Sequence, residues 1–140
     1  MTQLVSPASA SDRDDDVVLL SVPAAGAYLG VLRTATAGLA ARLQFTLDEI
    51  EDLRIAVDEE CAMLLAVTAD GADLSCRFTV TDGALTVETT VPTASGDQRL
   101  PAGESFAWQV LSALADEVSA EVDATSARIR LTKRRPASSM

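Results

Sequence analysis

Residues 73 to 91 carry the sequence pattern that most restricts the possible folds. In two runs, mostly apolar residues alternate with polar or charged residues, and the turn dipeptide Asp82-Gly83 separates the runs. The mostly apolar set comprises Leu74, Cys76, Phe78 and Val80 in the first run, and Leu85, Val87, Thr89 and Val91 in the second. This alternation around a turn predicts an antiparallel hairpin with one buried face. Antiparallel neighbours do not suit a doubly wound parallel sheet.

Two helices are predicted between a first strand and this hairpin. The strand is expected at 17–22, where apolar residues are nearly continuous and Pro23 closes the run. A helix follows at about 24–43. The next helix begins after Thr46, because Glu49 three residues later completes a capping-box signature. Its apolar stripe comprises Ile50, Leu53, Val57, Cys61, Leu64 and Leu65.

The periodicity disappears at 92–104, where two Pro and two Gly favour a long loop. A helix is then predicted at about 105–117, and two short strands are predicted near 118–122 and 127–132. The whole pattern predicts an α+β two-layer sandwich. Its mostly antiparallel sheet of about five strands is covered on one face by three helices.

Length and composition predict one domain at 17–135, between a disordered acidic arm at 1–16 and a tail at 136–140. A chain of 140 residues is the size of a single ordinary domain. No apolar run approaches the roughly 20 residues that a membrane span needs. Nothing at the N-terminus is typical of a secretion signal, so we expect a cytoplasmic protein without membrane contact.

Several kinds of chemistry are excluded by residue usage. The chain has no His, which removes the usual general base and excludes a histidine autokinase. Cys61 and Cys76 lack the spacing of zinc ligands, so we expect no metal site and two reduced, buried thiols. No Walker-type loop, dinucleotide fingerprint or nucleophile elbow is present.

The charge distribution favours a basic protein partner. The net charge of −10 argues against direct binding to nucleic acid. Seven acids lie within 46–68, against the single Arg54: Asp48, Glu49, Glu51, Asp52, Asp58, Glu59 and Glu60. A solvated helix face with no partner is the alternative interpretation.

Three stretches, at 53–61, 106–118 and 129–133, together with the order of elements, resemble a known family. The chain is similar to RsbW-type anti-sigma factors, and particularly to the actinobacterial group called UsfX. This family consists of relatives of serine-protein kinases with the Bergerat fold of GHKL, or histidine kinase-like, ATPases. The resemblance therefore implies a Bergerat-type fold for residues 17–135.

The resemblance also implies roles for individual residues. Glu59 matches the catalytic base that orients the attacking hydroxyl group, whereas Met63 stands where the family has an Asn that binds Mg²⁺. A thioether cannot replace a hard oxygen ligand for this ion. Gly103 and Thr132 match nucleotide-binding positions, but the second glycine motif is reduced to Gly103, and the adenine-binding Asp-x-Gly-x-Gly motif is missing from 87–97. An ordinary helix acid and an ordinary strand residue are the alternatives for Glu59 and Thr132.

The leading hypothesis is a cytoplasmic anti-sigma factor that sequesters an alternative sigma factor of the stress or sporulation type. The resemblance implies homodimerisation, and release by an anti-anti-sigma factor of the STAS type. Asp48, Glu51 and Asp52 are the candidate partner-binding residues, because sigma factors present basic DNA-contacting surfaces. Two alternatives remain: an active serine-protein kinase that uses ATP and Mg²⁺ to phosphorylate its antagonist, with Glu59 as base, and a nucleotide-binding switch without catalysis.

Overall fold

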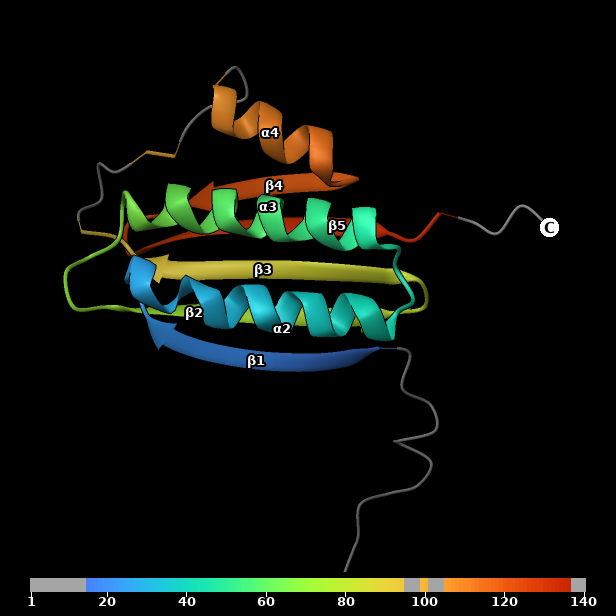
Figure 1. The fold of residues 1–140 in the computed structure, drawn as a ribbon. Helices are drawn as coiled ribbons and strands as arrows, with labels where there is room; N and C mark the ends of the chain where they lie inside the picture. Colours follow the sequence, from blue (N-terminus) through green and yellow to red (C-terminus); the bar gives the residue numbers. More distant parts are fainter. Residues whose placement is uncertain (1–14, 95–98, 101–104, 137–140) are drawn as a thin grey trace, which may run out of the picture.

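The computed structural model describes residues 15–94, 99–100 and 105–136. Within these residues, one antiparallel sheet has the strand order β1-β2-β3-β5-β4, and the helices lie on one side of it (Figure 1). The strands are β1 (Asp16–Pro23), β2 (Asp73–Thr81), β3 (Ala84–Pro92), β4 (Glu117–Val122) and β5 (Ser126–Arg134). The helices are the 3-10 helix η1 (Gly26–Tyr28), α2 (Leu29–Arg42), α3 (Leu47–Leu65) and α4 (Phe106–Leu114). The predicted two-layer α+β sandwich is confirmed.

The predicted hairpin is formed by β2 and β3. Thr81 and Ala84 form the closing pair around the Asp82-Gly83 turn. Gly83 has a φ of +76°, which a residue without a Cβ atom adopts at little cost. Phe78 pairs with Val87, so one side chain from each strand points into the core from the same face.

The hydrophobic core lies between the helices and the sheet. Side chains from α3 meet the inward-facing side chains of the sheet, and the following are fully buried: Leu53, Leu64, Leu74, Phe78, Leu85, Val87, Ile129 and Leu131. The predicted capping box starts α3. The Glu49 N–H donates to the Thr46 hydroxyl oxygen (3.1 Å), and the Thr46 N–H donates to Glu49 Oε1 (2.7 Å). These two bonds satisfy donors that the first helical turn leaves free.

Several element boundaries differ from the predictions. Strand β1 includes Asp16, which was predicted to belong to the arm. The predicted helix at 24–43 is replaced by η1 and the shorter α2, because the Ala24 N–H still donates to the Ala72 oxygen beside the sheet (2.9 Å). Helix α4 ends three residues early, because the Asp116 N–H already donates to the Thr132 oxygen of β5 (2.8 Å). Most of the predicted arm, loop and tail lies outside the described residues.

Helix α2 ends in a Schellman motif. The Phe45 N–H donates to the Ala40 oxygen (3.1 Å), and the Gln44 N–H donates to the Ala41 oxygen (2.9 Å). Gln44 has a φ of +65° at the position where such motifs most often use glycine. The motif turns the chain sharply from α2 into the connection that leads to α3.

None of the helices in the described part of the chain combines the length and apolar character that a bilayer crossing requires.

Candidate functional site

Helix α3 carries the residues that the family motif marks as catalytic. Glu59 is half-buried, and Met63 lies one turn further along the same flank of the helix. Met63 is only 4% exposed, so its thioether belongs to the core. The neighbouring Asp58 faces α2, where its Oδ1 accepts a hydrogen bond from Arg33 Nε (2.6 Å). Of these two neighbouring acids, Glu59 is therefore the one that does not face α2. It lies on the side of α3 that also carries Met63, which we call the motif flank.

The side chains of this region do not fit Mg²⁺. In the described part of the chain, no three His, Cys, Asp or Glu side chains come together as metal ligands. The motif position that would supply an oxygen holds the buried sulfur of Met63. Mg²⁺ requires near-octahedral oxygen coordination, so no phosphoryl-transfer step through this ion can be derived from these residues.

Glu60 is a buried acid at the centre of the interface between α3 and the sheet. Its exposure is 0%, and neither carboxylate oxygen has a hydrogen-bond partner among the described residues. Thr89 of β3 lies beside it, but the Thr89 hydroxyl donates to Cys76 Sγ (3.6 Å). Burial raises the pKa of Glu60 well above its usual value, and this effect outweighs the opposing influence of Thr89. Burial therefore favours the neutral form of the Glu60 carboxyl group.

The two cysteines next to Glu60 are free and buried, as predicted. Burial, reinforced by the nearby Glu60, raises the pKa of the Cys61 thiol, and burial raises the pKa of Cys76 to about 12. Nucleophilic cysteine chemistry requires a thiolate, which both environments oppose. Cys61 and Cys76 thus act as small core residues.

The three predicted partner-binding acids have different surroundings. Asp48 is exposed in the first turn of α3, whereas Glu51 accepts a hydrogen bond from Arg54 Nη1 (3.0 Å). Asp52 is half-buried and lies 3.7 Å from Lys133 Nζ, which also donates to the Leu114 oxygen of α4 (2.9 Å). Asp52 thus helps to connect α3 with α4 and β5.

The predicted nucleotide-binding residue Thr132 is not brought to α3. Thr132 lies on the open face of the sheet, opposite the helices, and its hydroxyl is 2.8 Å from that of Thr86. It is 7% exposed. The structure therefore separates Thr132 from Glu59 by the thickness of the sheet, and Gly103 lies outside the described residues.

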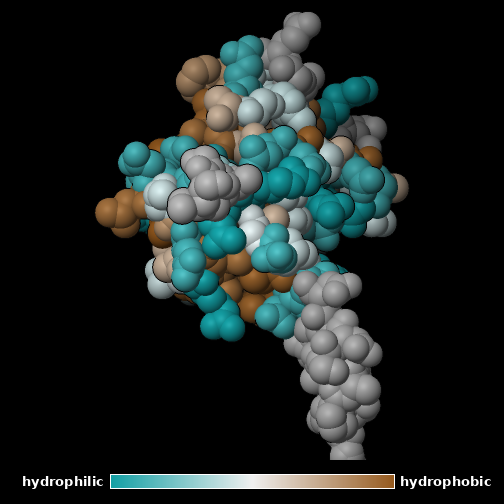
Figure 2. Space-filling model, turned by 90° about the vertical axis from the view of Figure 1, so that its right-hand side faces the viewer, coloured by the Kyte–Doolittle hydropathy of each residue, from teal (hydrophilic) through white to brown (hydrophobic). Residues whose placement is uncertain are grey.

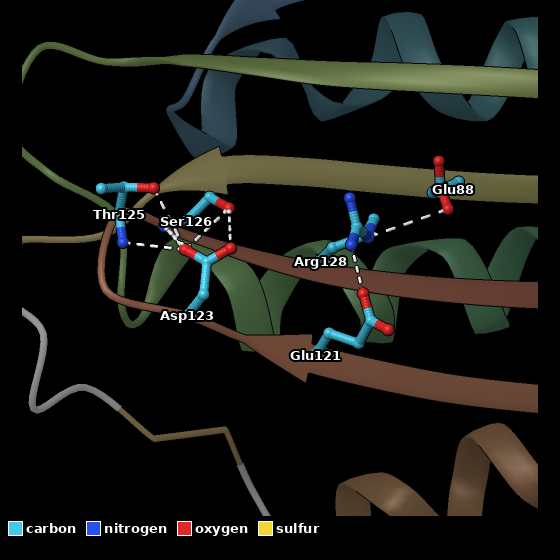
Figure 3. Close-up of polar contacts among 6 residues, drawn as sticks. All are labelled: Glu88, Glu121, Asp123, Thr125, Ser126 and Arg128. Carbon is cyan, nitrogen blue, oxygen red and sulfur yellow. Dashed lines mark hydrogen bonds and ion pairs between the residues drawn. The ribbon is translucent and has the colours of Figure 1, made fainter.

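The open face of the sheet is charged and polar. Arg128 of β5 lies between Glu121 of β4, to which it donates a hydrogen bond, and Glu88 of β3 at 3.9 Å (Figure 3). The hydrogen bond to Glu121 raises the pKa of Arg128. At the β4–β5 turn, Asp123 accepts bonds from the backbone N–H groups of Thr125 and Ser126 (both 2.8 Å), which lower its pKa.

Glu60 is the feature of this region that the sequence interpretation missed. It was counted with the acids of a solvated face, whereas the structure places it in the apolar stripe. Its spacing could have revealed this, because Glu60 follows Val57 by three residues and precedes Leu64 by four. Helical phase was therefore a better guide to its burial than residue type.

Comparison with known proteins finds relatives that share one name. The chain is 32% identical over 140 residues to the anti-sigma-F factor RsbW of Mycobacterium tuberculosis (strain H37Rv), an alignment covering 95% of this chain and 82% of the relative. It is 41% identical over 75 residues to the serine-protein kinase RsbW of Bacillus subtilis (strain 168), covering 51% of this chain and 47% of the relative. The serine-protein kinase RsbW of Bacillus pumilus matches at 32% over 77 residues, or 48% of its length.

The chain thus spans about half the length of these two Bacillus relatives, but most of the mycobacterial one. No family model matches the chain.

Proposed function

The chain belongs to the RsbW family, and on this premise we propose that it is an anti-sigma factor that sequesters an alternative sigma factor by direct binding. The observation that carries the proposal is the extent of the match to mycobacterial RsbW, a protein named as an anti-sigma-F factor. That match covers 95% of this chain and 82% of the relative. A sigma factor held in this way could not assemble with RNA polymerase.

The exposed side of α3 is the proposed binding surface for the sigma factor. Asp48 and Glu51 are exposed on it, and they lie beside Leu47, which is 85% exposed, and Ile55, which is 43% exposed. Acids around apolar residues suit a basic protein partner, because the charges guide association and the apolar side chains can be buried on binding. Figure 2 views the end of the molecule at which α3 begins, where polar residues (teal) and apolar residues (brown) both reach the surface.

Binding rather than catalysis is the proposed output, because Met63 supplies no oxygen to Mg²⁺. Family membership supports the remaining parts of the proposal. These are a cytoplasmic location, a functional domain at 17–135, homodimerisation, and release of the sigma factor by an anti-anti-sigma antagonist of the STAS type. Asp52 would contribute to partner binding mainly by holding α4 against α3 through Lys133.

The proposal is tested by measuring association with purified alternative sigma factors of the source organism at low salt. Changing Asp48→Lys and Glu51→Lys together should slow association by about tenfold, because both acids guide a basic partner. Asp70→Lys is the matched control, since it reverses an exposed acid beyond the end of α3. If no sigma factor binds the unaltered protein, the anti-sigma function is wrong. Equal rates for the double variant and the control would refute only the placement on α3.

An active serine-protein kinase is the second candidate, supported by the names of the Bacillus relatives and by the half-buried Glu59 on the motif flank. Calorimetric titration with Mg-ATP, followed by a phosphotransfer assay with the antagonist, tests it. Transfer that Glu59→Ala abolishes would establish the kinase. ATP binding without transfer, accompanied by altered affinity for the sigma factor, would instead support a nucleotide switch with Gly103 and Thr132 as candidate contacts.

A further inference from the structure

A pocket of about 750 Å³ lies at one end of the sheet, away from the motif flank of α3. The β2–β3 turn, the start of β4, the end of β5 and the connection between α2 and α3 meet at this end (Figure 1). Its volume is within the range of small-molecule sites. The lining is mostly polar and includes Asp82, Thr86, Glu117, Arg130, Thr132 and Arg135.

Arg130 supplies an uncompensated positive charge to this pocket. Its neighbour across β3 is Glu88, but the Glu88 carboxylate is directed to Arg128 instead (Figure 3). Arg130 makes no ion pair or hydrogen bond with any residue that the structure describes. By contrast, Arg134 in the same pocket is paired with Glu117. A free guanidinium group is therefore present in a chain whose net charge is −10.

Further hydrogen-bond donors surround this guanidinium group. Thr86 and Thr132 form a hydroxyl pair at 2.8 Å in which one proton is shared, so the other hydroxyl proton is free to meet an acceptor. Arg135 is held in place by two hydrogen bonds. Its backbone N–H donates to the Gly83 backbone oxygen (2.7 Å), and its side-chain Nη1 donates to the Leu43 backbone oxygen (3.0 Å). The rest of the Arg135 guanidinium group remains available as a donor.

We propose that this pocket binds the phosphate group of a small phosphorylated molecule, with Arg130 and Arg135 as the charged donors and Thr132 at its floor. Guanidinium groups match the geometry of phosphate oxygens, and a hydroxyl donor adds a direction to the interaction. The acids of the pocket are Asp82 and Glu117. Glu117 is neutralised by Arg134, whereas Asp82 is exposed on the turn. Arg130 and Thr132 lie on the open face of the sheet, on the other side from α3, because their neighbours Ile129 and Leu131 are the residues of β5 that face the core.

Titration of the ¹⁵N-labelled protein followed by two-dimensional NMR tests the proposal. The probes are inorganic phosphate and adenosine monophosphate, each at constant ionic strength, with adenosine as the probe that lacks phosphate. Phosphate and adenosine monophosphate should give saturable shifts at Gly83, Arg130, Thr132 and Arg135. Arg130→Gln should weaken binding by about tenfold, because it removes charge-assisted hydrogen bonds. Thr132→Val should weaken it by a smaller factor.

Arg128→Gln is the matched control, because this arginine lies on the same face but is already paired with acids. It should leave the affinity for phosphate unchanged, and the spectrum of each variant shows whether it is folded. The proposal is overturned if phosphate gives no saturable shifts, if adenosine binds as tightly as adenosine monophosphate, or if the shifts centre on Glu59 and Met63. Equal weakening by Arg128→Gln and Arg130→Gln would also overturn it.

Discussion

The two faces of the sheet treat charged side chains in opposite ways. On the face beneath the helices, Glu60 is fully buried among apolar residues and has no partner among the described residues. On the open face, Glu121 and Glu88 both lie near Arg128 and remain in contact with water. A glutamate is thus unpaired where its charge is costly, and paired where pairing contributes little.

This difference separates the origin of stability from the place of recognition. The covered face stabilises the fold by removing apolar surface from water. A buried polar group without a hydrogen-bond partner is destabilising there. The open face contributes little to stability, so its arginines and hydroxyl groups are free to serve a ligand. Substitutions on the covered face should therefore change the free energy of unfolding more than substitutions on the open face.

The largest effect is expected from Phe78→Ala on the covered face. Phe78 is completely buried, so this change should lower the free energy of unfolding by about 3–5 kcal/mol. Arg77→Ala, one residue away on the open face, should change it by less than about 0.5 kcal/mol. Urea denaturation measures both values. Similar losses from the two variants would show that the faces are not energetically distinct.

The next largest effect should be a gain in stability from Glu60→Leu. The substitution removes an unpaired buried carboxyl group and keeps an apolar side chain of similar size. The free energy of unfolding at pH 8 should therefore rise by about 1–3 kcal/mol. Glu59→Leu, at the half-buried neighbouring position, serves as the control and should give a much smaller change. Destabilisation by Glu60→Leu would mean that the carboxyl group has a partner in solution.

Part of that gain should depend on pH. Burial raises the pKa of Glu60 in the folded state, so ionisation favours the unfolded state once the pH exceeds about 4.5, the usual value for this group. The free energy of unfolding should then fall as the pH rises towards the folded-state pKa. Glu60→Gln should lack this decline. Denaturation curves of both proteins between pH 4 and pH 8 test the expectation, and parallel pH profiles would contradict it.

The smallest effect should come from the ion pair on the open face. A double-mutant cycle with Glu121→Gln and Arg128→Gln should give a coupling energy below about 1 kcal/mol, because both side chains are substantially exposed. Salt at about 1 M should reduce this coupling further, since it screens exposed charges. A coupling energy above about 2 kcal/mol that resists salt would remove the energetic contrast between the faces.

Local patterns predicted much of the fold. The capping box formed by Thr46 and Glu49 depends on residues within one helical turn, and the β2–β3 hairpin depends on alternation around Asp82-Gly83. The predicted ends of the helices at 24–43 and 105–117 were less accurate, because the structure has η1, α2 and α4 with different bounds. These ends are decided by backbone bonds to distant segments, such as the bond from Asp116 to Thr132.

The candidate sites were predicted only in part. The spacing of the α3 motif singled out Glu59 and Met63, which share a flank because helical geometry fixes their positions. No local pattern showed that Asp52 meets Lys133, or that Thr132 faces away from α3. Both facts depend on where β5 lies in the sheet.

By itself, the sequence determined the period, the caps and the turns, because these arise from interactions among residues a few positions apart. The tertiary structure alone decided that β5 lies between β3 and β4, which brings Arg130 and Thr132 beside Thr86 and Glu117. It also decided that Glu60 is enclosed without a partner. Such outcomes depend on which distant surfaces exclude water together, and many segments of the chain contribute to that free energy at once.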